Sequence, residues 1–144
     1  MSYTKIYIHA VWCTQYRKPY LYKSFREKIF DHMREYGRSK GIYIDIVNGY
    51  VQHVHCLISL NRDQNIADCM HLIKGESSYW INKEKFIGTK FRWQDDYYAV
   101  SIGISHLQNL RRYIKNQEAH HNKKRSFKDE EEEFLRRYQF LKQI

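Results

Sequence analysis

The chain has 144 residues, which is the length of one domain. Its 25 Lys and Arg against 16 Asp and Glu give a net charge of +9, which favours a polyanionic partner such as nucleic acid. Hydrophobic residues at 42% exclude a disordered chain, no apolar run reaches the roughly 18 residues of a membrane span, and the N-terminus lacks a signal-peptide pattern. Three widely spaced cysteines are typical of reduced thiols, so we expect a cytoplasmic protein that does not bind membranes.

The first elements along the chain are a strand and a helix. Residues 5–13 form an almost continuous apolar and aromatic run, which predicts a central strand. Residues 22–36 repeat apolar side chains at helical spacing, and Gly37 and Gly41 are expected to close that helix.

A hairpin is the clearest local pattern. Asn48 and Gly49 stand between two alternating runs, and both residue types tolerate the positive φ that a two-residue turn needs. The pattern therefore predicts paired antiparallel strands over residues 42–47 and 50–60.

The second half predicts a helix, a strand and another helix. Residues 65–82 read as a helix, and a polar, basic loop separates it from a short strand over residues 97–102. Ser105 is expected to open the last helix, in a capping box with Gln108, and that helix runs to about Asn122.

The order of elements, βαββαβ followed by a helix, predicts the α+β class. It indicates a ferredoxin-like core with a four-stranded antiparallel sheet and an additional C-terminal helix. We expect one domain over residues 1–125 and a charged tail over 126–144, which we expect to be helical; its acidic run has no role that the sequence reveals.

His53 and His55 lie two residues apart on the second hairpin strand. Side chains two apart project from the same face of a strand, so this pair could chelate one divalent ion. Val54, Cys56 and Ile58 fall on the other face and are expected in the core. A pair that only decorates an exposed sheet face is the alternative.

The last helix presents a second group of polar side chains. A packing stripe is formed by Ile104, Leu107, Leu110 and Ile114, and a stripe about a quarter turn away by His106, Tyr113, Gln117 and His120. Tyr113 and Gln117 are one turn apart, so a hydroxyl and an amide oxygen are presented together. Arg111 and Arg112 beside them are candidates for phosphate contacts, although a solvated charge pair explains them equally well.

Several segments resemble one family. HVHCLI is a His-hydrophobic-His (HUH) motif, and YIKNQEAHH with the downstream SFKDE…FL is similar to the C-terminal helix of small single-tyrosine HUH transposases of bacterial insertion sequences, the IS-two-hundred-like family. IYIHAVWCTQYRKPYL resembles that family's opening strand and basic loop, and FRWQDDYYAVSIG its late strand. The resemblance covers nearly the whole chain in the right order.

The resemblance implies a function. In such transposases the two HUH histidines, here His53 and His55, bind Mg²⁺ or Mn²⁺ with a third ligand, here Gln117. The tyrosine, here Tyr113, attacks single-stranded DNA, forms a 5′-phosphotyrosine and frees a 3′-hydroxyl. The family recognises DNA hairpins and acts as homodimers whose active sites are shared between subunits.

The same resemblance extends to DNA contacts and leaves one ligand open. Arg17 and Lys18 in the basic loop join Arg111 and Arg112 as candidate DNA contacts. His120 and His121 lie close enough on the helix to compete with Gln117 as metal ligands.

Two other function classes compete with a DNA-cleaving and strand-joining enzyme. One is a domesticated, non-catalytic protein that binds structured single-stranded nucleic acid through its basic charge and aromatic side chains. The other is a metal-dependent hydrolase that uses water as nucleophile and leaves no protein–DNA adduct.

Overall fold

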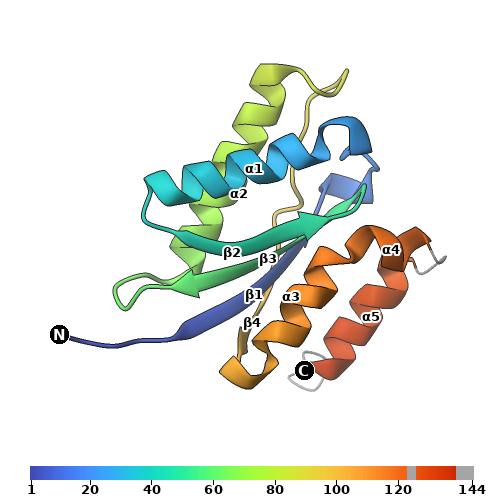
Figure 1. Cartoon of the computed structure of the whole chain (residues 1–144). Helices are drawn as coiled ribbons and strands as arrows, with labels where there is room; N and C mark the ends of the chain where they lie inside the picture. The colour runs from blue at the N-terminus through green and yellow to red at the C-terminus, as the bar shows by residue number, and fades with distance from the viewer. Residues whose placement is uncertain (123–125, 139–144) are drawn as a thin grey trace.

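The computed structural model describes residues 1–122 and 126–138. Its main elements follow the order β1 (Ile6–Cys13), α1 (Lys23–Ser39), β2 (Tyr43–Gly49), β3 (His53–Leu60), α2 (Ile66–Glu84), β4 (Tyr98–Ile102), α3 (Leu107–Lys115), α4 (Gln117–Asn122) and α5 (Phe127–Arg137), with short 3-10 turns at Gln15–Arg17 and Ile104–His106. All strand pairs are antiparallel, in the order β2-β3-β1-β4. This confirms the predicted ferredoxin-like class (Figure 1).

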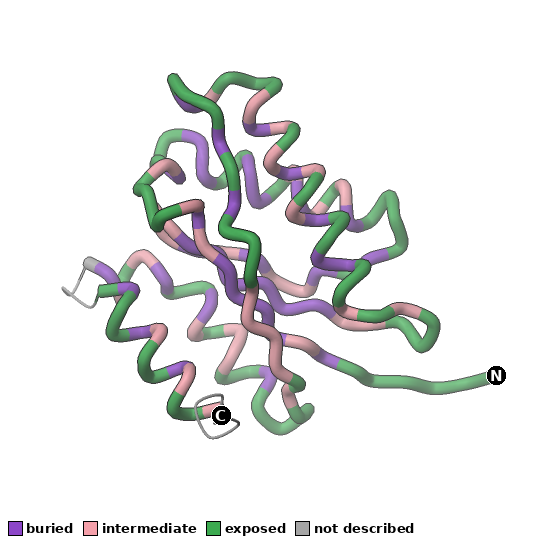
Figure 2. The backbone as a smooth tube through the Cα atoms, turned by 180° about the vertical axis from the view of Figure 1, so that it is seen from behind, coloured by how far each residue is buried: buried purple, intermediate pink, exposed green. Residues whose placement is uncertain are grey.

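Helices cover both faces of the sheet. In Figure 1, α1 and α2 lie on one side and α3, α4 and α5 on the other. Alternation along β1 serves both layers: Ala10 and Trp12 enter the core beneath α1 and α2, whereas Tyr7 and Val11 pack toward α3 and α5. Buried residues are therefore concentrated in the sheet, between the two helical layers (Figure 2).

The hairpin is confirmed, but its turn was predicted in the wrong place. β2 extends through Asn48 and Gly49, both of which pair with residues of β3, and neither has a positive φ. The chain turns at residues 50–52, where the Tyr50 amide donates to the His53 carbonyl. Gly49 is required for close approach, because a Cβ there would lie 2.1 Å from the His53 oxygen.

The first helix ends just before Gly41, the second of the two glycines predicted to close it. Gly37 lies inside α1, where a Cβ would come within 3.0 Å of the Ile42 carbonyl oxygen. Gly41 takes a φ of +72°, a left-handed conformation that allows the chain to leave the helix.

The end of the chain departs from the single predicted helix. A 3-10 turn precedes α3, so Ser105 does not cap it, and the helix breaks at Asn116 before α4 begins. The tail forms α5, whose N-cap Ser126 accepts a hydrogen bond from the Asp129 amide. None of the helices in the described part of the chain is long and apolar enough to cross a membrane.

Candidate active site

The two histidines lie on the face of β3 that the C-terminal helices cover. Val54, Cys56 and Ile58 point the other way, into the core beneath α1 and α2, as alternation predicted. His53 and His55 are 0% and 1% exposed, so they are turned away from that core but are buried by a second layer. The alternative hypothesis, that His53 and His55 lie on an exposed sheet face, is therefore wrong.

Tyr113 comes from α3, a helix anchored on the edge strand of the same chain. The Asn48 side-chain amide donates to the carbonyls of Ile114 and Lys115 at 2.9 and 3.0 Å, which satisfies two carbonyls at the end of α3. The ring of Tyr113 meets that of His55 edge-on, with centroids 5.6 Å apart. Asn48 thus holds the tyrosine helix on the histidine hairpin, a role that a turn would not provide.

A break in the helix brings Gln117 to the histidines. Asn116 has φ −97° and ψ 22°, which separates α3 from α4. Gln117 follows it and is fully buried, with its Oε1 2.9 Å from Nε2 of His53. Tyr113 and Gln117 therefore face the same histidine pair, although they belong to two helices.

Glu130 of α5 lies at the centre of this cluster, and the sequence patterns did not single it out. The side chain is almost fully buried. The Tyr113 hydroxyl donates to its Oε1 at 2.6 Å, and Nε2 of His55 is 2.5 Å from the same oxygen. Its Oε2 lies 2.7 Å from Nε2 of His121 and 3.6 Å from Nε2 of His53. One carboxylate therefore joins the phenol to three histidines.

A weak signal for Glu130 was present in the tail. Phe127, Glu130 and Phe134 share one face of a helix, and all three are buried. An acid inside an apolar stripe indicates a buried partner. Because Glu130 belongs to an acidic run whose other members are partly or fully exposed, the stripe could not be told from a solvated face.

The cluster holds a buried negative charge. Burial lowers the pKa of His53 to about 4, so its imidazole is neutral at pH 7. Burial alone would raise the pKa of Glu130, but the hydrogen bond from His121 and the other histidine contacts hold that pKa well below its ordinary range. An ionised carboxylate is thus buried beside a neutral imidazole, and a nearby positive charge would compensate its desolvation.

The donor atoms also fit a divalent metal ion. Nδ1 of His53 lies 3.1 Å from Oε1 of Gln52, which favours hydrogen on Nδ1 and leaves the Nε2 lone pair facing Oε1 of Gln117. At 2.9 Å these two atoms form a hydrogen bond in any tautomer or amide orientation that places hydrogen between them. Ligand atoms of His53, His55 and Glu130 all lie within 4.8 Å of one another. The buried His-His-Glu group, with the Gln117 amide beside it, therefore has the nitrogen and oxygen donors that a divalent ion takes.

The two histidines of α4 take different places. His121 contacts the carboxylate of Glu130, whereas the ring of His120 packs against Tyr113 with centroids 4.9 Å apart. Neither belongs to the His53, His55 and Glu130 group that lies within metal-ligand range.

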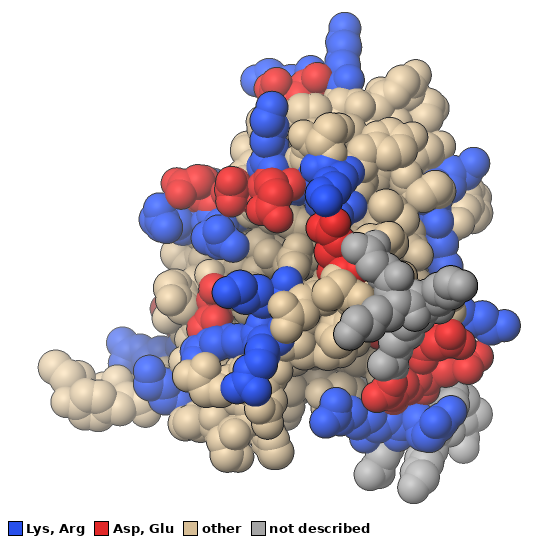
Figure 3. Space-filling model, turned by 45° about the vertical axis from the view of Figure 1, so that its right-hand side comes forward, with Lys and Arg blue, Asp and Glu red and all other residues tan. Residues whose placement is uncertain are grey.

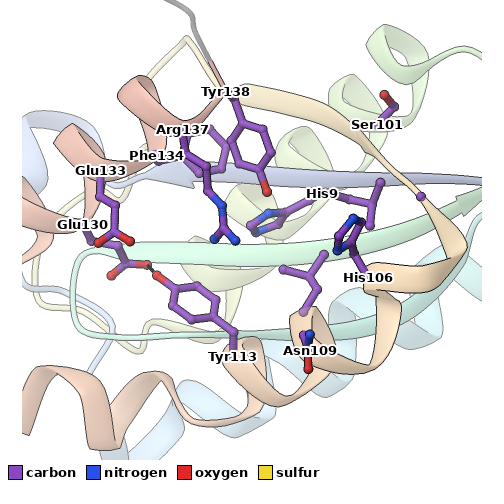
Figure 4. Close-up of a pocket in the computed structure, with 13 residues that line it drawn as sticks. His9, Ser101, His106, Asn109, Tyr113, Glu130, Glu133, Phe134, Arg137 and Tyr138 are labelled. Atoms are coloured by element: carbon purple, nitrogen blue, oxygen red, sulfur yellow. Dashed lines mark hydrogen bonds between the residues drawn. The ribbon is translucent and has the colours of Figure 1, made fainter.

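A cavity of about 410 Å³ reaches the tyrosine between α3 and α5. Tyr113 and Glu130 line it, together with His9 of β1 and Arg137 of α5. The hydrogen bond between Tyr113 and Glu130 is visible in Figure 4. The cavity thus reaches Tyr113 and Glu130, which in turn contact the buried histidines.

Of the four basic residues proposed to contact DNA, two are bonded to carboxylates of this chain and two are exposed. Arg17 donates to a carboxylate of α5, and Arg111 donates to both oxygens of Asp45 at 2.9 and 2.7 Å. Lys18 and Arg112 are exposed. Lys and Arg are interleaved with Asp and Glu over the face in Figure 3, so the positive charge is spread out there.

Comparison with known proteins places the sequence among transposases. The profile of the family described as "Transposase IS200 like" matches residues 2–117. The ISDra2 transposase TnpA of Deinococcus radiodurans is 26% identical over 115 residues, which cover 76% of this chain and 81% of that protein.

Two solved structures share the fold. One is a protein of Deinococcus radiodurans R1 that has been proposed as a transposase, with a TM-score of 0.66 and 20% identity over 81% of this chain and 93% of that one. The other is a REP-associated tyrosine transposase bound to a REP hairpin, with a TM-score of 0.57 and 17% identity over 81% and 67% of the two chains. At these identities the likeness shows the fold alone.

Proposed function

The chain belongs to the IS200-like transposases, and on this premise we propose that it cleaves and rejoins single-stranded DNA with Tyr113 as the nucleophile. The observation that carries the proposal is the 2.6 Å hydrogen bond from the Tyr113 hydroxyl to Glu130, whose carboxylate also contacts the HUH histidines. The phenol and the candidate metal ligands thus occupy one site beside a cavity.

The reaction begins at the phenolic oxygen. Tyr113 attacks the scissile phosphorus, the bond to the 3′ oxygen breaks, and the 5′ phosphate stays on the tyrosine while the 3′ oxygen takes up a proton. A phenol with an ordinary pKa near 10 is a weak nucleophile at neutral pH, so it needs an acceptor for its hydrogen. The Glu130 carboxylate accepts the hydrogen bond of the Tyr113 hydroxyl and orients its oxygen, and the proton that the phenol loses is matched by the one that the 3′ oxygen takes up. In the reverse reaction a 3′-hydroxyl attacks the phosphotyrosine and rejoins a strand without ATP.

We assign the metal ligands to His53, His55, Gln117 and Glu130. A bound divalent ion would supply charge stabilisation to the phosphate oxygens during in-line displacement. Two imidazole nitrogens with two oxygens favour Mn²⁺ over Mg²⁺, because Mg²⁺ prefers oxygen ligands. Glu130 brings this set closer to the needs of Mg²⁺ than His53, His55 and Gln117 would alone.

The proposed substrate is a single strand that folds into a hairpin. The net charge of +9 favours a nucleic acid, and Lys18 and Arg112 are exposed for phosphate contacts. A structural neighbour in this fold is a tyrosine transposase bound to a REP hairpin, which supports a hairpin substrate here.

The test is a denaturing gel after incubation of the protein with end-labelled hairpin DNA and Mn²⁺. We expect a protein-linked species that carries the label of the 5′-phosphate side, and a free fragment that ends in a 3′-hydroxyl. Cleavage without a linked species would identify water as the nucleophile and a hydrolase. Binding without any cleavage would identify a non-catalytic nucleic-acid-binding protein.

We expect Glu130→Gln to weaken Mn²⁺ binding by about 10–100-fold and to slow cleavage, because the amide keeps the size of the side chain but removes its charge. Calorimetric titration with Mn²⁺ and the gel assay measure the two effects. The matched control is Glu131→Gln on the next residue, whose carboxylate pairs with Arg17 outside the His-His-Glu group. Faster cleavage by Glu130→Gln would contradict the ligand role and show that this carboxylate obstructs the site.

Association of two copies stays a prediction, but the chain brings its own Tyr113 to its own histidines. A shared site would require α3 to leave the hydrogen bonds from Asn48. We therefore expect a mixture of inactive His53→Ala and inactive Tyr113→Phe proteins to stay inactive after subunit exchange. Recovery of cleavage in the mixture would show instead that two copies exchange their tyrosine helices, as the family resemblance implies.

A further inference from the structure

We infer that His9 is a positioning residue that determines which nitrogen of His55 is available to a metal ion. The inference rests on the proposed function, because it concerns the same divalent-ion site. His9 lies in the middle of the apolar run that predicted β1, where a histidine is most simply a core residue.

The contact between the two imidazoles is direct and buried. Nε2 of His9 lies 2.9 Å from Nδ1 of His55, and His9 is 2% exposed. The two rings are stacked with centroids 5.1 Å apart and planes 23° apart. Phe134 of α5 meets the ring of His9 edge-on at 5.5 Å, so the imidazole is held between β3 and α5.

This contact controls the tautomer of His55. A neutral imidazole carries hydrogen on one nitrogen and a lone pair on the other, and a metal ion binds the lone pair. When Nδ1 of His55 donates to Nε2 of His9, the lone pair of His55 is on Nε2. That atom is the one that lies 2.5 Å from Glu130, on the side of the proposed metal ligands.

An imidazole at position 9 can serve both states of the site. Without a metal ion, Nε2 of His9 can donate to Nδ1 of His55, whose Nε2 lies against Glu130. With a metal ion, His55 donates to His9 instead, and the hydrogen of His9 lies on its own Nδ1, which has no hydrogen-bond partner among the described residues. The hydrogen bond between His9 and His55 can therefore be kept in either state.

The contact with His55 also orders His9 itself. Nδ1 of His9 is buried and has no hydrogen-bond partner among the described residues. A core histidine kept only for its volume would leave two buried polar atoms to satisfy, and each unsatisfied group is destabilising. The hydrogen bond to His55 is therefore the specific reason for an imidazole at this position.

The experiment compares His9→Leu with His9→Gln in the full chain. Leucine removes the partner of His55, whereas the terminal amide of glutamine offers both a donor and an acceptor near the former Nε2. We expect Mn²⁺ affinity, measured by calorimetry without DNA, to fall about 10–100-fold in His9→Leu and to be largely retained in His9→Gln. The matched control is His32→Leu, which removes another hydrogen-bonded histidine, on α1 and far from this pair.

A spectroscopic measurement separates positioning from general damage. Nitrogen chemical shifts of the histidine side chains, recorded with diamagnetic Zn²⁺ as the probe, report which nitrogen of His55 carries hydrogen. We expect wild type and His9→Gln to show hydrogen on Nδ1 of His55 when Zn²⁺ is bound, and His9→Leu to lose that state.

The outcomes distinguish this inference from the proposed function. Equal Mn²⁺ affinity and equal His55 shifts in wild type and His9→Leu would overturn the role of His9 and leave the metal site standing. Equal loss in His9→Leu and His9→Gln would also overturn it, because the amide should rescue the contact. A wild-type protein that binds neither ion would refute the proposed metal site and, with it, the role of His9.

Discussion

Replacing Tyr113 by phenylalanine should abolish the covalent protein–DNA species while hairpin affinity stays within about twofold. Only the phenolic oxygen is removed, and the ring keeps its contacts with His55 and His120. Removal of a nucleophile typically costs a factor on the order of 10³ or more in rate. Denaturing gels measure the adduct, and a fluorescence-anisotropy titration with labelled hairpin measures affinity.

A matched tyrosine controls for loss of a phenol beside α5. Tyr98 donates to Glu131, the neighbour of Glu130, at 3.2 Å. Tyr98→Phe should therefore keep the adduct at its wild-type level. An adduct that persists in Tyr113→Phe would move the nucleophile to another tyrosine, with Tyr138 at the same cavity and Tyr36 on α1 as the first to examine.

The second large effect is expected at the HUH pair. His55→Ala should eliminate Mn²⁺-dependent cleavage and weaken Mn²⁺ binding, because it removes a ligand and leaves the Glu130 carboxylate without one of its close partners. His53→Ala should behave alike, since both imidazoles present Nε2 to the same carboxylate. The measurements are cleavage against Mn²⁺ concentration and direct calorimetric titration.

Two controls test whether cleavage requires a metal ion at the HUH pair. His32→Ala removes a histidine that pairs with Glu76 on the opposite side of the sheet, and it should leave both measurements unchanged. Treatment of wild type with EDTA should stop cleavage, and added Mn²⁺ should restore it. Full activity in EDTA would exclude the metal ion from the reaction.

Regular alternation explains why much of the site could be predicted. The period of two along β3 places His53 and His55 on the opposite face from the core residues between and after them. Because both faces are buried, the pairing register of β3 is fixed. The helical spacing of Tyr113 and Gln117 brings both to one face, even though the helix breaks between them.

Other features depend on contacts between distant segments, which local patterns do not contain. Asn48 and Gly49 are residue types that favour a turn, but here they make tertiary contacts. The Asn48 side chain donates to the end of α3, and the absence of a side chain at Gly49 leaves room for the His53 carbonyl. Glu130 reaches the histidines only because α5 folds back over the sheet. His9 acquires its partner through the pairing of β1 with β3, 46 residues apart in sequence.

The most direct measurement of the central claim is peptide mapping of the trapped protein–DNA adduct by mass spectrometry. The wild-type protein is incubated with hairpin DNA and Mn²⁺, the adduct is isolated under denaturing conditions, and nuclease and protease digestion leave a nucleotide on one peptide. We predict a 5′-phosphodiester on Tyr113. A nucleotide on any other residue, or complete cleavage with no modified peptide, would contradict the assignment.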